Sequence, residues 1–419
     1  MKILHAADLH IDSPLGGLTA YEGAPVDEIR GATRQAAENL IRAALDHDVS
    51  LVLLAGDIFD GDWPDYSTGL FWNEQLDRLH KANIPVVSVA GNHDARSQIS
   101  RNLQLPPNVT QLSTSKPQVV TFEDLGVEVI GQGYATRDVN MDLTEAYPVG
   151  DPNMFSIGLL HTALNGRPGH ANYAPASVEG LRSKGYQYWA LGHVHTREVV
   201  HQDPWIVFPG NTQGRHAGET GPKGATMVTV QNGTVASVEH LVLDSVRWDS
   251  CVVDATRCVS SDDVRSAVAN QLSTITANAE GRLAAVRVQI TGASPAHEDL
   301  WADIHGFEAE IRSVANANGR LWVEKVKMST TRPVDLAAAR DDDAVGALAH
   351  RIEELRHDRD ALATYEDAFS DLAKKLGADA RTGEGSPVDP TKIGSAGHLA
   401  EQLDASLELV VALLAEERA

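Results

Sequence analysis

The sequence predicts an α/β protein that begins with a layered domain of parallel and antiparallel strands. Short apolar runs rich in Val, Ile and Leu alternate with amphipathic helical patterns at the start of the chain, and a strand-rich stretch then follows up to residue 243. The chain has 419 residues, more than one hydrophobic core usually serves, so we expect a second folded part behind this domain.

Units of a strand followed by a helix open the chain. Strands are expected at residues 2–8, 50–57 and 83–94, where apolar residues cluster. Amphipathic helices are expected between them, at 26–49 and about 66–82, because their apolar residues recur with a helical period. Six more strands are then predicted, at residues 126–131, 155–161, 186–193, 204–210, 224–230 and 233–243.

A smaller α+β module follows near residue 245. Its predicted order is strand, helix, strand, helix, strand, at residues 247–255, 261–278, 283–292, about 296–316 and 321–328. Beyond residue 335 the sequence becomes highly charged, and helices are expected at 341–377 and 398–419. We therefore predict a first domain at 1–243, a second at 244–332 and a charged helical segment at 333–419.

Charge and composition restrict the class of protein. The formal net charge of −23 argues against binding nucleic acid with the whole surface, although it allows a local basic patch. No apolar run approaches the roughly 18 residues of a membrane span, and the N-terminus lacks the apolar core of a secretory signal. Cys251 and Cys258 offer neither a disulfide framework nor a zinc-binding spacing. We expect a soluble, cytoplasmic protein with no membrane partner.

Five of the predicted strands end in side chains that can bind metals. These ends carry Asp8 and His10, Asp57, Asn92 and His93, His161, and His193 and His195. Ligands of α/β sheets bind in the crevice beyond the carboxyl ends of the strands, so these side chains are expected to converge. Carboxylate, imidazole and amide groups suit a divalent metal, and their number favours two metals that share a bridging carboxylate. Each motif alone is also typical of an ordinary turn, but all five occur together.

The motifs D-x-H, GD, GNHD, a lone His and GHVH, taken as a set, resemble the calcineurin-like metallophosphoesterase superfamily. Within it, the segments HAADLHIDSP and FPGNTQGRHAGETGPKGA are similar to bacterial DNA-repair exonucleases of the SbcD type, especially the YhaO-like branch. The resemblance covers about residues 1–240 by motif, and residues 245–330 by the order of elements alone. It implies a four-layer β-sandwich flanked by helices, a small α+β capping domain and C-terminal helices.

The resemblance also implies a role for each of these side chains. One metal would be bound by Asp8, His10 and His195, the other by Asn92, His161 and His193, and Asp57 would bridge the two. Such a pair of metals stabilises the attacking and leaving oxygens of a phosphodiester and lowers the pKa of a shared water. His93 would face the scissile phosphate and stabilise charge there or protonate the leaving oxygen. Family members mostly use Mn²⁺, although mixed nitrogen and oxygen ligands also accept Fe or Zn.

Three further residues each have two interpretations. Asp60 stands where some relatives carry a histidine, and it could orient His93 or be a solvated turn residue. The glycine-rich loop at 209–225 lacks the ending of an ATP-binding P-loop and precedes a strand, so ATP binding is not expected. Arg215 and His216 in this loop could contact the substrate backbone or brace the loop itself.

These features predict a metal-dependent DNA phosphodiesterase, by resemblance a 3′-to-5′ exonuclease that could also cut single strands internally. The alternatives are a phosphodiesterase or phosphatase for small molecules or phosphoproteins, and a non-catalytic partner of an ATPase. In SbcD-like nucleases the C-terminal helices dock on an SbcC-type coiled-coil ATPase. Here the apolar stripe of residues 407–419 could pack on such a partner or on its own domain. The sequence leaves open whether the chain forms a homodimer.

Overall fold

The computed structural model describes residues 1–14, 24–60, 66–96, 103–165, 173–317 and 319–333, and also residues 347, 350–352 and 354–355. The chain forms two compact units, Met1–Ser250 with Leu272–Arg287 and Ala315–Lys325, and Cys251–Gln271 with Val288–Val314 and Val326–Ala419. Among the described helices, none has the length and apolar character needed to span a membrane. The predicted C-terminal helices lie largely outside the described residues, and the predicted division into domains stays a prediction.

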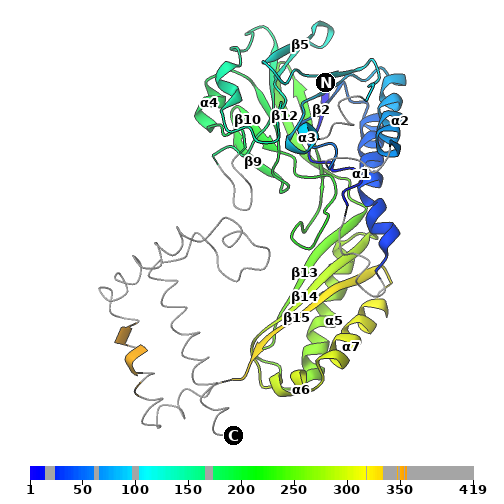
Figure 1. Cartoon of the computed structure of the whole chain (residues 1–419), viewed down its shortest axis with the longest axis vertical. Helices are drawn as coiled ribbons and strands as arrows, with labels where there is room; N and C mark the ends of the chain where they lie inside the picture. Colours follow the sequence, from blue (N-terminus) through cyan, green and yellow to red (C-terminus); the bar gives the residue numbers. More distant parts are fainter. Residues whose placement is uncertain are drawn as a thin grey trace. The chain divides into compact units, whose positions relative to one another are not determined.

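The first sheet has six strands in the order β12-β11-β1-β2-β3-β4, and Figure 1 labels β2 and β12 of this sheet. Four of them run parallel to one another: β1 (Lys2–Ala6), β2 (Leu51–Leu54), β3 (Val86–Ser88) and β4 (Val109–Gln111). On the other side of β1, an antiparallel hairpin is formed by β11 (Gly224–Gln231) and β12 (Thr234–Val242). The early strand–helix units thus build one half of this sheet, and a late hairpin builds the other half.

The second sheet also has six strands, in the order β5-β6-β7-β8-β10-β9. Its parallel centre consists of β6 (Val127–Gly131), β7 (Phe155–His161), β8 (Tyr188–Gly192) and β10 (Trp205–Phe208). Its antiparallel edges are β5 (Gln118–Phe122) and β9 (Glu198–Gln202). The sequence analysis did not predict β4, β5 and β9. Each lies at the edge of a sheet, where partly exposed residues leave no continuous apolar run.

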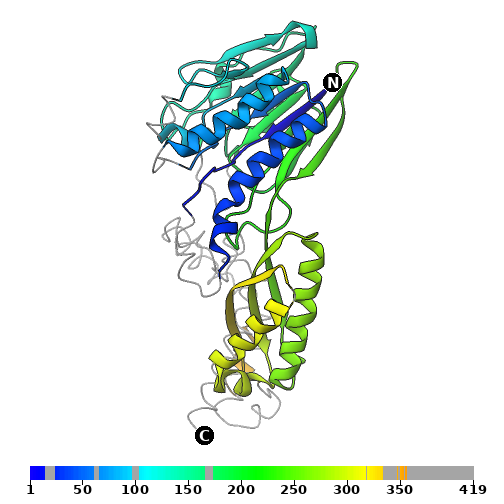
Figure 2. The same cartoon turned by 90° about the vertical axis from the view of Figure 1, so that its right-hand side faces the viewer.

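The two sheets pack face to face and helices cover their outer faces, which confirms the predicted four-layer α/β sandwich. Ile3 of β1 and Ile157 of β7 belong to the apolar layer between the sheets. Two helices, α1 (Val26–Asp46) and α2 (Ser67–Lys81), lie side by side on the outer face of the first sheet (Figure 2). A short helix, α4 (Val178–Arg182), packs on the outer face of the second sheet. Because the central strands are buried on both faces, they appear in the sequence as apolar runs.

His5 is a polar residue in the layer between the two sheets. Its Nε2 lies 3.1 Å from the Leu191 carbonyl oxygen, and its Nδ1 lies 2.9 Å from the Tyr188 hydroxyl. Burial lowers the pKa of His5 to about 3, so the ring is neutral. Since a carbonyl can only accept, Nε2 donates to Leu191 and Nδ1 accepts from Tyr188. These bonds tie β1 to β8 close to the strand ends from which Asp8 and His193 follow.

The α+β module has the predicted order of elements with one difference. Its strands form a sheet in the order β13-β14-β15. The elements are β13 (Val246–Asp254), α5 (Ser261–Asn278), β14 (Leu283–Ala293), α6 (His297–Ala302), α7 (Ile304–Ala317) and β15 (Leu321–Thr331). The single helix expected at about 296–316 is therefore two helices. Asp303 leaves the helical conformation at φ −143°, and its carboxylate accepts a hydrogen bond from Gly306 N at 2.8 Å, which caps α7.

The packing of the second sheet can be tested at Gly158 in β7. Gly158 pairs with Trp189 of β8, and a methyl group at Gly158 would overlap the buried indole ring. Gly158→Ala should therefore lower the free energy of unfolding by about 1–3 kcal/mol, the usual cost of overpacking a core. Urea denaturation of the metal-free chain measures this change.

Gly31→Ala is the matched control for this substitution. Gly31 lies inside α1, and a methyl group there would meet no atom within 4 Å. The control should raise the free energy of unfolding by about 0.5–1 kcal/mol, because alanine loses less backbone entropy in a helix. If the two variants changed stability in the same direction and by the same amount, the close contact at Gly158 would be refuted.

Candidate metal centre

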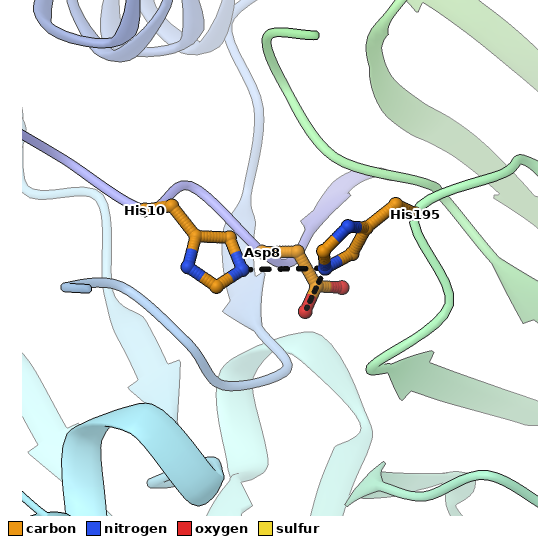
Figure 3. A group of neighbouring side chains, drawn as sticks. All are labelled: Asp8, His10 and His195. Atoms are coloured by element: carbon orange, nitrogen blue, oxygen red, sulfur yellow. Dashed lines mark hydrogen bonds and ion pairs between the residues drawn. The ribbon is translucent and has the colours of Figure 1, made fainter. Parts of the chain in front are cut away.

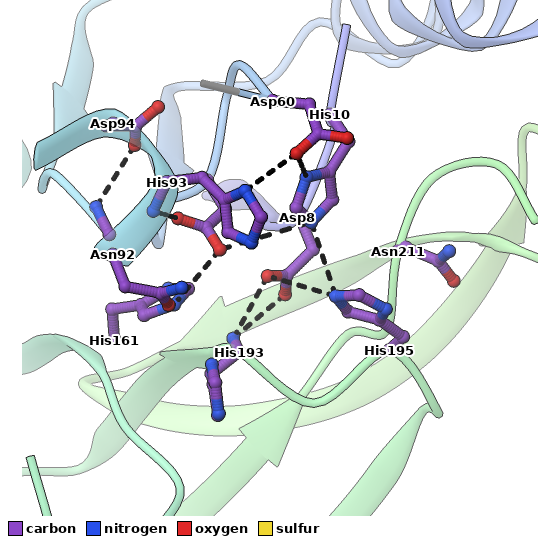
Figure 4. A network of polar contacts seen from close by, with 12 residues as sticks. Asp8, His10, Asp60, Asn92, His93, Asp94, His161, His193, His195 and Asn211 are labelled. Atoms are coloured by element: carbon purple, nitrogen blue, oxygen red, sulfur yellow. Dashed lines mark hydrogen bonds and ion pairs between the residues drawn. The ribbon is translucent and has the colours of Figure 1, made fainter. Parts of the chain in front are cut away.

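The structure brings the seven predicted ligands together where strand ends from both sheets meet, and Figure 4 labels all of them except Asp57. The first sheet supplies Asp8 and His10 after β1, Asp57 after β2 and Asn92 after β3, and the second supplies His161 at the end of β7 and His193 and His195 after β8. Among the predicted ligands, two groups of three have all their ligand atoms within 4.8 Å of one another: Asp8, His10 and His195, and Asp57, His161 and His193. A third group with the same spacing joins His10 to Asp60 and His93.

Asp8, His10 and His195 form the first group (Figure 3). The Nε2 atoms of His10 and His195 lie 3.3 Å apart, and His195 Nε2 is 3.8 Å from Asp8 Oδ1. Burial raises the pKa of the Asp8 carboxyl to about 6 and lowers the pKa of the His10 imidazole. The two ring nitrogens and the carboxylate oxygen converge on one place, and a divalent cation fits there.

His161 is the centre of the second group. Its Nε2 lies 3.4 Å from Asp57 Oδ2 and 3.0 Å from Asn92 Oδ1. Its Nδ1 lies 2.9 Å from the Ala55 carbonyl oxygen, which can only accept, so Nδ1 carries a proton. Burial lowers the pKa of His161, but the carboxylates of Asp57 and Asp8 outweigh this effect and raise it to about 9. Nε2 is therefore the ring nitrogen that faces Asp57 and Asn92, and it is the atom that could bind a cation.

Asp57 lies between the two groups. Its Oδ2 is 3.4 Å from His161 Nε2 and 4.0 Å from His10 Nε2, and its Oδ1 accepts a hydrogen bond from His93 N at 2.9 Å. Burial tends to raise the pKa of Asp57, but His161, His10 and His93 outweigh it and hold the pKa below its usual value. One ionised oxygen thus faces a nitrogen of each group. The donor set fits two divalent cations that share Asp57.

The backbone around the centre is strained at four of the predicted ligands. Asp8, His10, Asp57 and His193 have φ angles of 52°, 44°, 52° and 100°, in the left-handed region that non-glycine residues rarely adopt. Hydrogen bonds hold this conformation: Asp8 N donates to the Gly56 carbonyl at 3.0 Å, and His193 N donates to Asp8 Oδ2 at 2.9 Å. The left-handed conformation at these positions turns the four side chains toward one centre.

Glycines in the motifs give the ligands of neighbouring strands room to approach. A methyl group at Gly91 would overlap the Asp57 carboxylate, and one at Gly192 would overlap the Ala55 carbonyl. The glycines of GNHD and GHVH are therefore required by close contacts across the strands. At these two positions the close packing of the strands requires the glycine of the motif.

His93 and Asp60 form a pair beside the metal ligands. His93 Nδ1 lies 2.7 Å from Asp60 Oδ1, and Asp60 Oδ2 accepts a hydrogen bond from Ser13 Oγ at 2.6 Å. The hydrogen bond to Asp60 raises the pKa of His93. Burial raises the pKa of Asp60, but the imidazoles of His10 and His93 outweigh it and lower the pKa. Asp60 makes the contact that an orienting residue needs, while its role and that of His93 stay predictions.

Arg215 and His216 lie at the edge of the centre in different environments. Arg215 is largely buried, with one guanidinium nitrogen 2.9 Å from Glu219 Oε1 and another 3.6 Å from Asp60 Oδ2. His216 is half exposed, and its Nδ1 accepts a hydrogen bond from Gly218 N at 3.1 Å. These contacts brace the loop, and contact with a substrate remains a prediction for both residues.

Glu219 is the residue near the centre that the sequence analysis missed. Its side chain is buried, and Oε1 lies 2.7 Å from His195 Nδ1. The available signal was an acidic residue within the glycine-rich segment that follows GHVH. That signal is weak, because an acidic residue in such a loop is usually solvated.

Comparison with known proteins agrees with this geometry. Models of two families match the chain: calcineurin-like phosphoesterase at residues 1–197, and the middle domain of metallophosphoesterase YhaO at residues 248–331. The uncharacterized metallophosphoesterase YhaO of Bacillus subtilis (strain 168) is 33% identical over 299 residues, which cover 70% of this chain and 72% of that protein. The chain belongs to the calcineurin-like phosphoesterase family. This confirms the resemblance of the motifs, and a calcineurin-like phosphoesterase is a metal-dependent phosphoester hydrolase with a dinuclear site.

More distant similarity links this calcineurin-like phosphoesterase to proteins named DNA double-strand break repair protein Mre11. The Mre11 protein of Saccharolobus solfataricus is 26% identical over 215 residues, which cover 49% of this chain and 52% of that protein. The Mre11 protein of Sulfolobus acidocaldarius is 23% identical over 316 residues, which cover 72% of this chain and 77% of that protein.

Metal binding can be tested by replacing single carboxylates. If Asp57 bridges two cations, Asp57→Asn should weaken both Mn²⁺ binding events, whereas Asp8→Asn should weaken one. Each affected Mn²⁺ affinity should fall by at least about 10–100-fold, which is the loss expected when a hydrogen-bond partner of a metal ligand is removed. Isothermal titration of the chelator-treated chain with Mn²⁺ measures both events.

Asp12→Asn is the matched control for these carboxylates. Asp12 lies close to His10 in sequence but is held by Arg34, whose Nε is 2.7 Å from Asp12 Oδ1, and by Thr68. Both Mn²⁺ affinities should stay at the wild-type values in this variant. Two unchanged binding events in Asp57→Asn would refute the bridging position.

Proposed function

We propose that the protein hydrolyses the phosphodiester bonds of DNA and removes nucleotides from 3′ ends as an exonuclease. The observation that carries this proposal is the position of Asp57 Oδ2, 3.4 Å from His161 Nε2 and 4.0 Å from His10 Nε2. Such a donor set would hold two divalent metals, which would supply Lewis-acid stabilisation of a phosphodiester and activation of water. We propose Mn²⁺ as the metal, because mixed nitrogen and oxygen ligands accept it.

His93 is the chain's own candidate for proton transfer. Its backbone N–H is bound to Asp57, and its Nδ1 lies 2.7 Å from Asp60, so the position and tilt of the ring are both restrained. With Nδ1 bound to Asp60, the other ring nitrogen is left to hold a proton for the leaving oxygen. The side chain is 37% exposed, in contrast to the buried ligands around it, which suits contact with a substrate.

Support for DNA as the substrate comes from relatives and from the second module. The Mre11 relatives carry DNA double-strand break repair in their names. Residues 248–331 match the middle domain of YhaO, and a small phosphate ester would need no such additional module. We therefore favour a polymeric phosphodiester, with an internal cut in single strands as a second activity.

The charge of the chain favours one alternative. A protein with a formal net charge of −23 repels nucleic acid over most of its surface, which favours a phosphodiesterase or phosphatase for small molecules or phosphoproteins. For DNA, the bound metals and a few local cations such as Arg215 would have to supply the attraction. A non-catalytic partner of an ATPase is the weaker alternative, because it has no use for a complete set of ligands.

An SbcC-type ATPase is the partner we propose, docked through the charged helical segment at 333–419. Such a partner would add positive surface that this acidic chain lacks. Most of that segment lies outside the described residues, so the proposal rests on the pattern in its sequence. A homodimer and a cytoplasmic location stay predictions as well.

The role of His93 can be separated from that of the metal ligands. His93→Ala should slow hydrolysis by about 10²–10⁴-fold, the usual effect of removing a general acid, and should leave the Mn²⁺ content unchanged. Rates with bis-p-nitrophenyl phosphate and metal analysis of the same samples measure both quantities. His47→Ala, an exposed histidine on α1's C-terminal end, is the control and should keep the wild-type rate. Loss of metal together with activity would mean that His93 is a ligand.

The substrate class can be tested with the Mn²⁺-loaded full chain. We expect single-stranded and duplex DNA labelled at the 5′ end to be shortened to a ladder, and bis-p-nitrophenyl phosphate to be cleaved faster than p-nitrophenyl phosphate. Because few cations are available to displace counterions, DNA affinity should fall only weakly with salt concentration. Asp57→Asn serves as the inactive control. Rapid hydrolysis of p-nitrophenyl phosphate with all DNA left intact would overturn the proposal in favour of a phosphatase.

A further inference from the structure

The loop at 209–223, between β10 and β11, places a buried carboxylate behind the first group of ligands. Figure 4 shows Asn211 of this loop next to His195. The carboxylate belongs to Glu219, whose contacts are His195 Nδ1 at 2.7 Å, a guanidinium nitrogen of Arg215 at 2.9 Å, Arg215 N at 2.8 Å and Asn211 Nδ2 at 2.8 Å. Every one of these partners can donate a hydrogen bond, so the carboxylate accepts from all of them.

The contacts of Glu219 decide which ring nitrogen of His195 carries the proton. An ionised carboxylate can only accept, so the 2.7 Å contact requires a proton on Nδ1. Nε2 then keeps its lone pair, and it is this atom that lies 3.8 Å from Asp8 and 3.3 Å from His10 Nε2. The same tautomer is the one that can bind a metal through Nε2.

Arg215 is a competing hydrogen-bond partner for His195 Nδ1. One of its guanidinium nitrogens lies 3.2 Å from His195 Nδ1, and a donation from it would leave the proton on Nε2. That nitrogen is closer to Glu219 Oε1, at 2.9 Å, and the bond to the carboxylate is strengthened by both charges. The shorter, charge-assisted bonds therefore favour Glu219 as the partner of both His195 and Arg215.

We propose that Glu219 is a positioning residue that holds His195 in its metal-binding tautomer and so sets the affinity of the site formed with Asp8 and His10. This inference rests on the metal dependence in the proposed function but not on the choice of DNA as substrate. Removing a partner that orients a metal-binding histidine usually costs about 10–100-fold in metal affinity. The loss should be confined to one of the two metals.

A second role of Glu219, bracing the loop, has to be separated from this one. Glu219 holds Asn211 and Arg215, while the same loop is anchored independently at Gln213. The side chain of Gln213 donates to the Val246 carbonyl at 2.6 Å and accepts from Ser245 N at 2.8 Å. The Gln213 side chain forms its hydrogen bonds with Gly214, Ser245 and Val246, so Gln213→Met loosens the loop and leaves the carboxylate–imidazole pair in place.

The experiment titrates Mn²⁺ into the metal-free full chain for the wild type, Glu219→Gln, His195→Ala and Gln213→Met. Glu219→Gln should weaken, by about 10–100-fold, the same binding event that His195→Ala removes, and leave the other event unchanged. Gln213→Met should lower the thermal midpoint and leave both affinities unchanged. Unchanged affinities in Glu219→Gln, a loss in the other event, or an equal loss in Gln213→Met would each overturn the proposal.

A measurement on the wild type decides the question even if Glu219→Gln fails to fold. NMR spectra of the metal-free, ¹⁵N-histidine-labelled chain at mildly alkaline pH identify the tautomer of His195 through long-range nitrogen–proton correlations. The His195 signals are assigned as those that are missing from the spectrum of His195→Ala. A proton on Nδ1 supports the proposal, and a proton on Nε2 overturns it. A wild type that binds Mn²⁺ as expected but cleaves no DNA refutes the proposed substrate alone, whereas one that binds no Mn²⁺ refutes both proposals.

Discussion

The burial of Asp57 between two sets of metal ligands is the constraint on which the rest of the structure depends. An ionised carboxylate that is almost fully buried needs compensating charge and hydrogen bonds. Asp57 obtains them from His93 N at 2.9 Å and from the nearby nitrogens of His161 and His10, which come from different sheets. A centre of this kind therefore exists only where the ends of both sheets meet.

The layer between the sheets fixes that meeting point. Apolar side chains fill it, and His5, which donates to Leu191 and accepts from Tyr188, joins β1 to β8 a few residues before the predicted metal ligands. Strain in the left-handed backbone of Asp8 and His193 is tolerated because this packing and the bond between His193 N and Asp8 restrain both turns. The packing of the sandwich thus holds the predicted ligands in place.

The histidines of the centre share one principle of orientation. In three of them Nδ1 faces an acceptor: the Ala55 carbonyl for His161, Asp60 for His93 and Glu219 for His195. Ala55 and Asp60 lie in the segment that follows β2, Glu219 lies in the loop before β11, and each acceptor leaves Nε2 for a metal or a substrate. The chemistry of the centre therefore depends on the acceptors that bind Nδ1 of these histidines as much as on the ligands themselves.

The sequence by itself determined the α/β class and the positions of the ligand motifs, because apolar runs and the polar residues that end them are local patterns. The sequence did not predict edge strands such as β5, the break between helices at Asp303 or the burial of His5. Exposure and capping depend on neighbours in space. Only the tertiary structure showed the contact between Asp60 and His93 and introduced Glu219, which lies 24 residues from His195 in sequence and 2.7 Å away in space. A hydrogen-bond partner is decided by how the sheets and loops pack, and no local pattern encodes that.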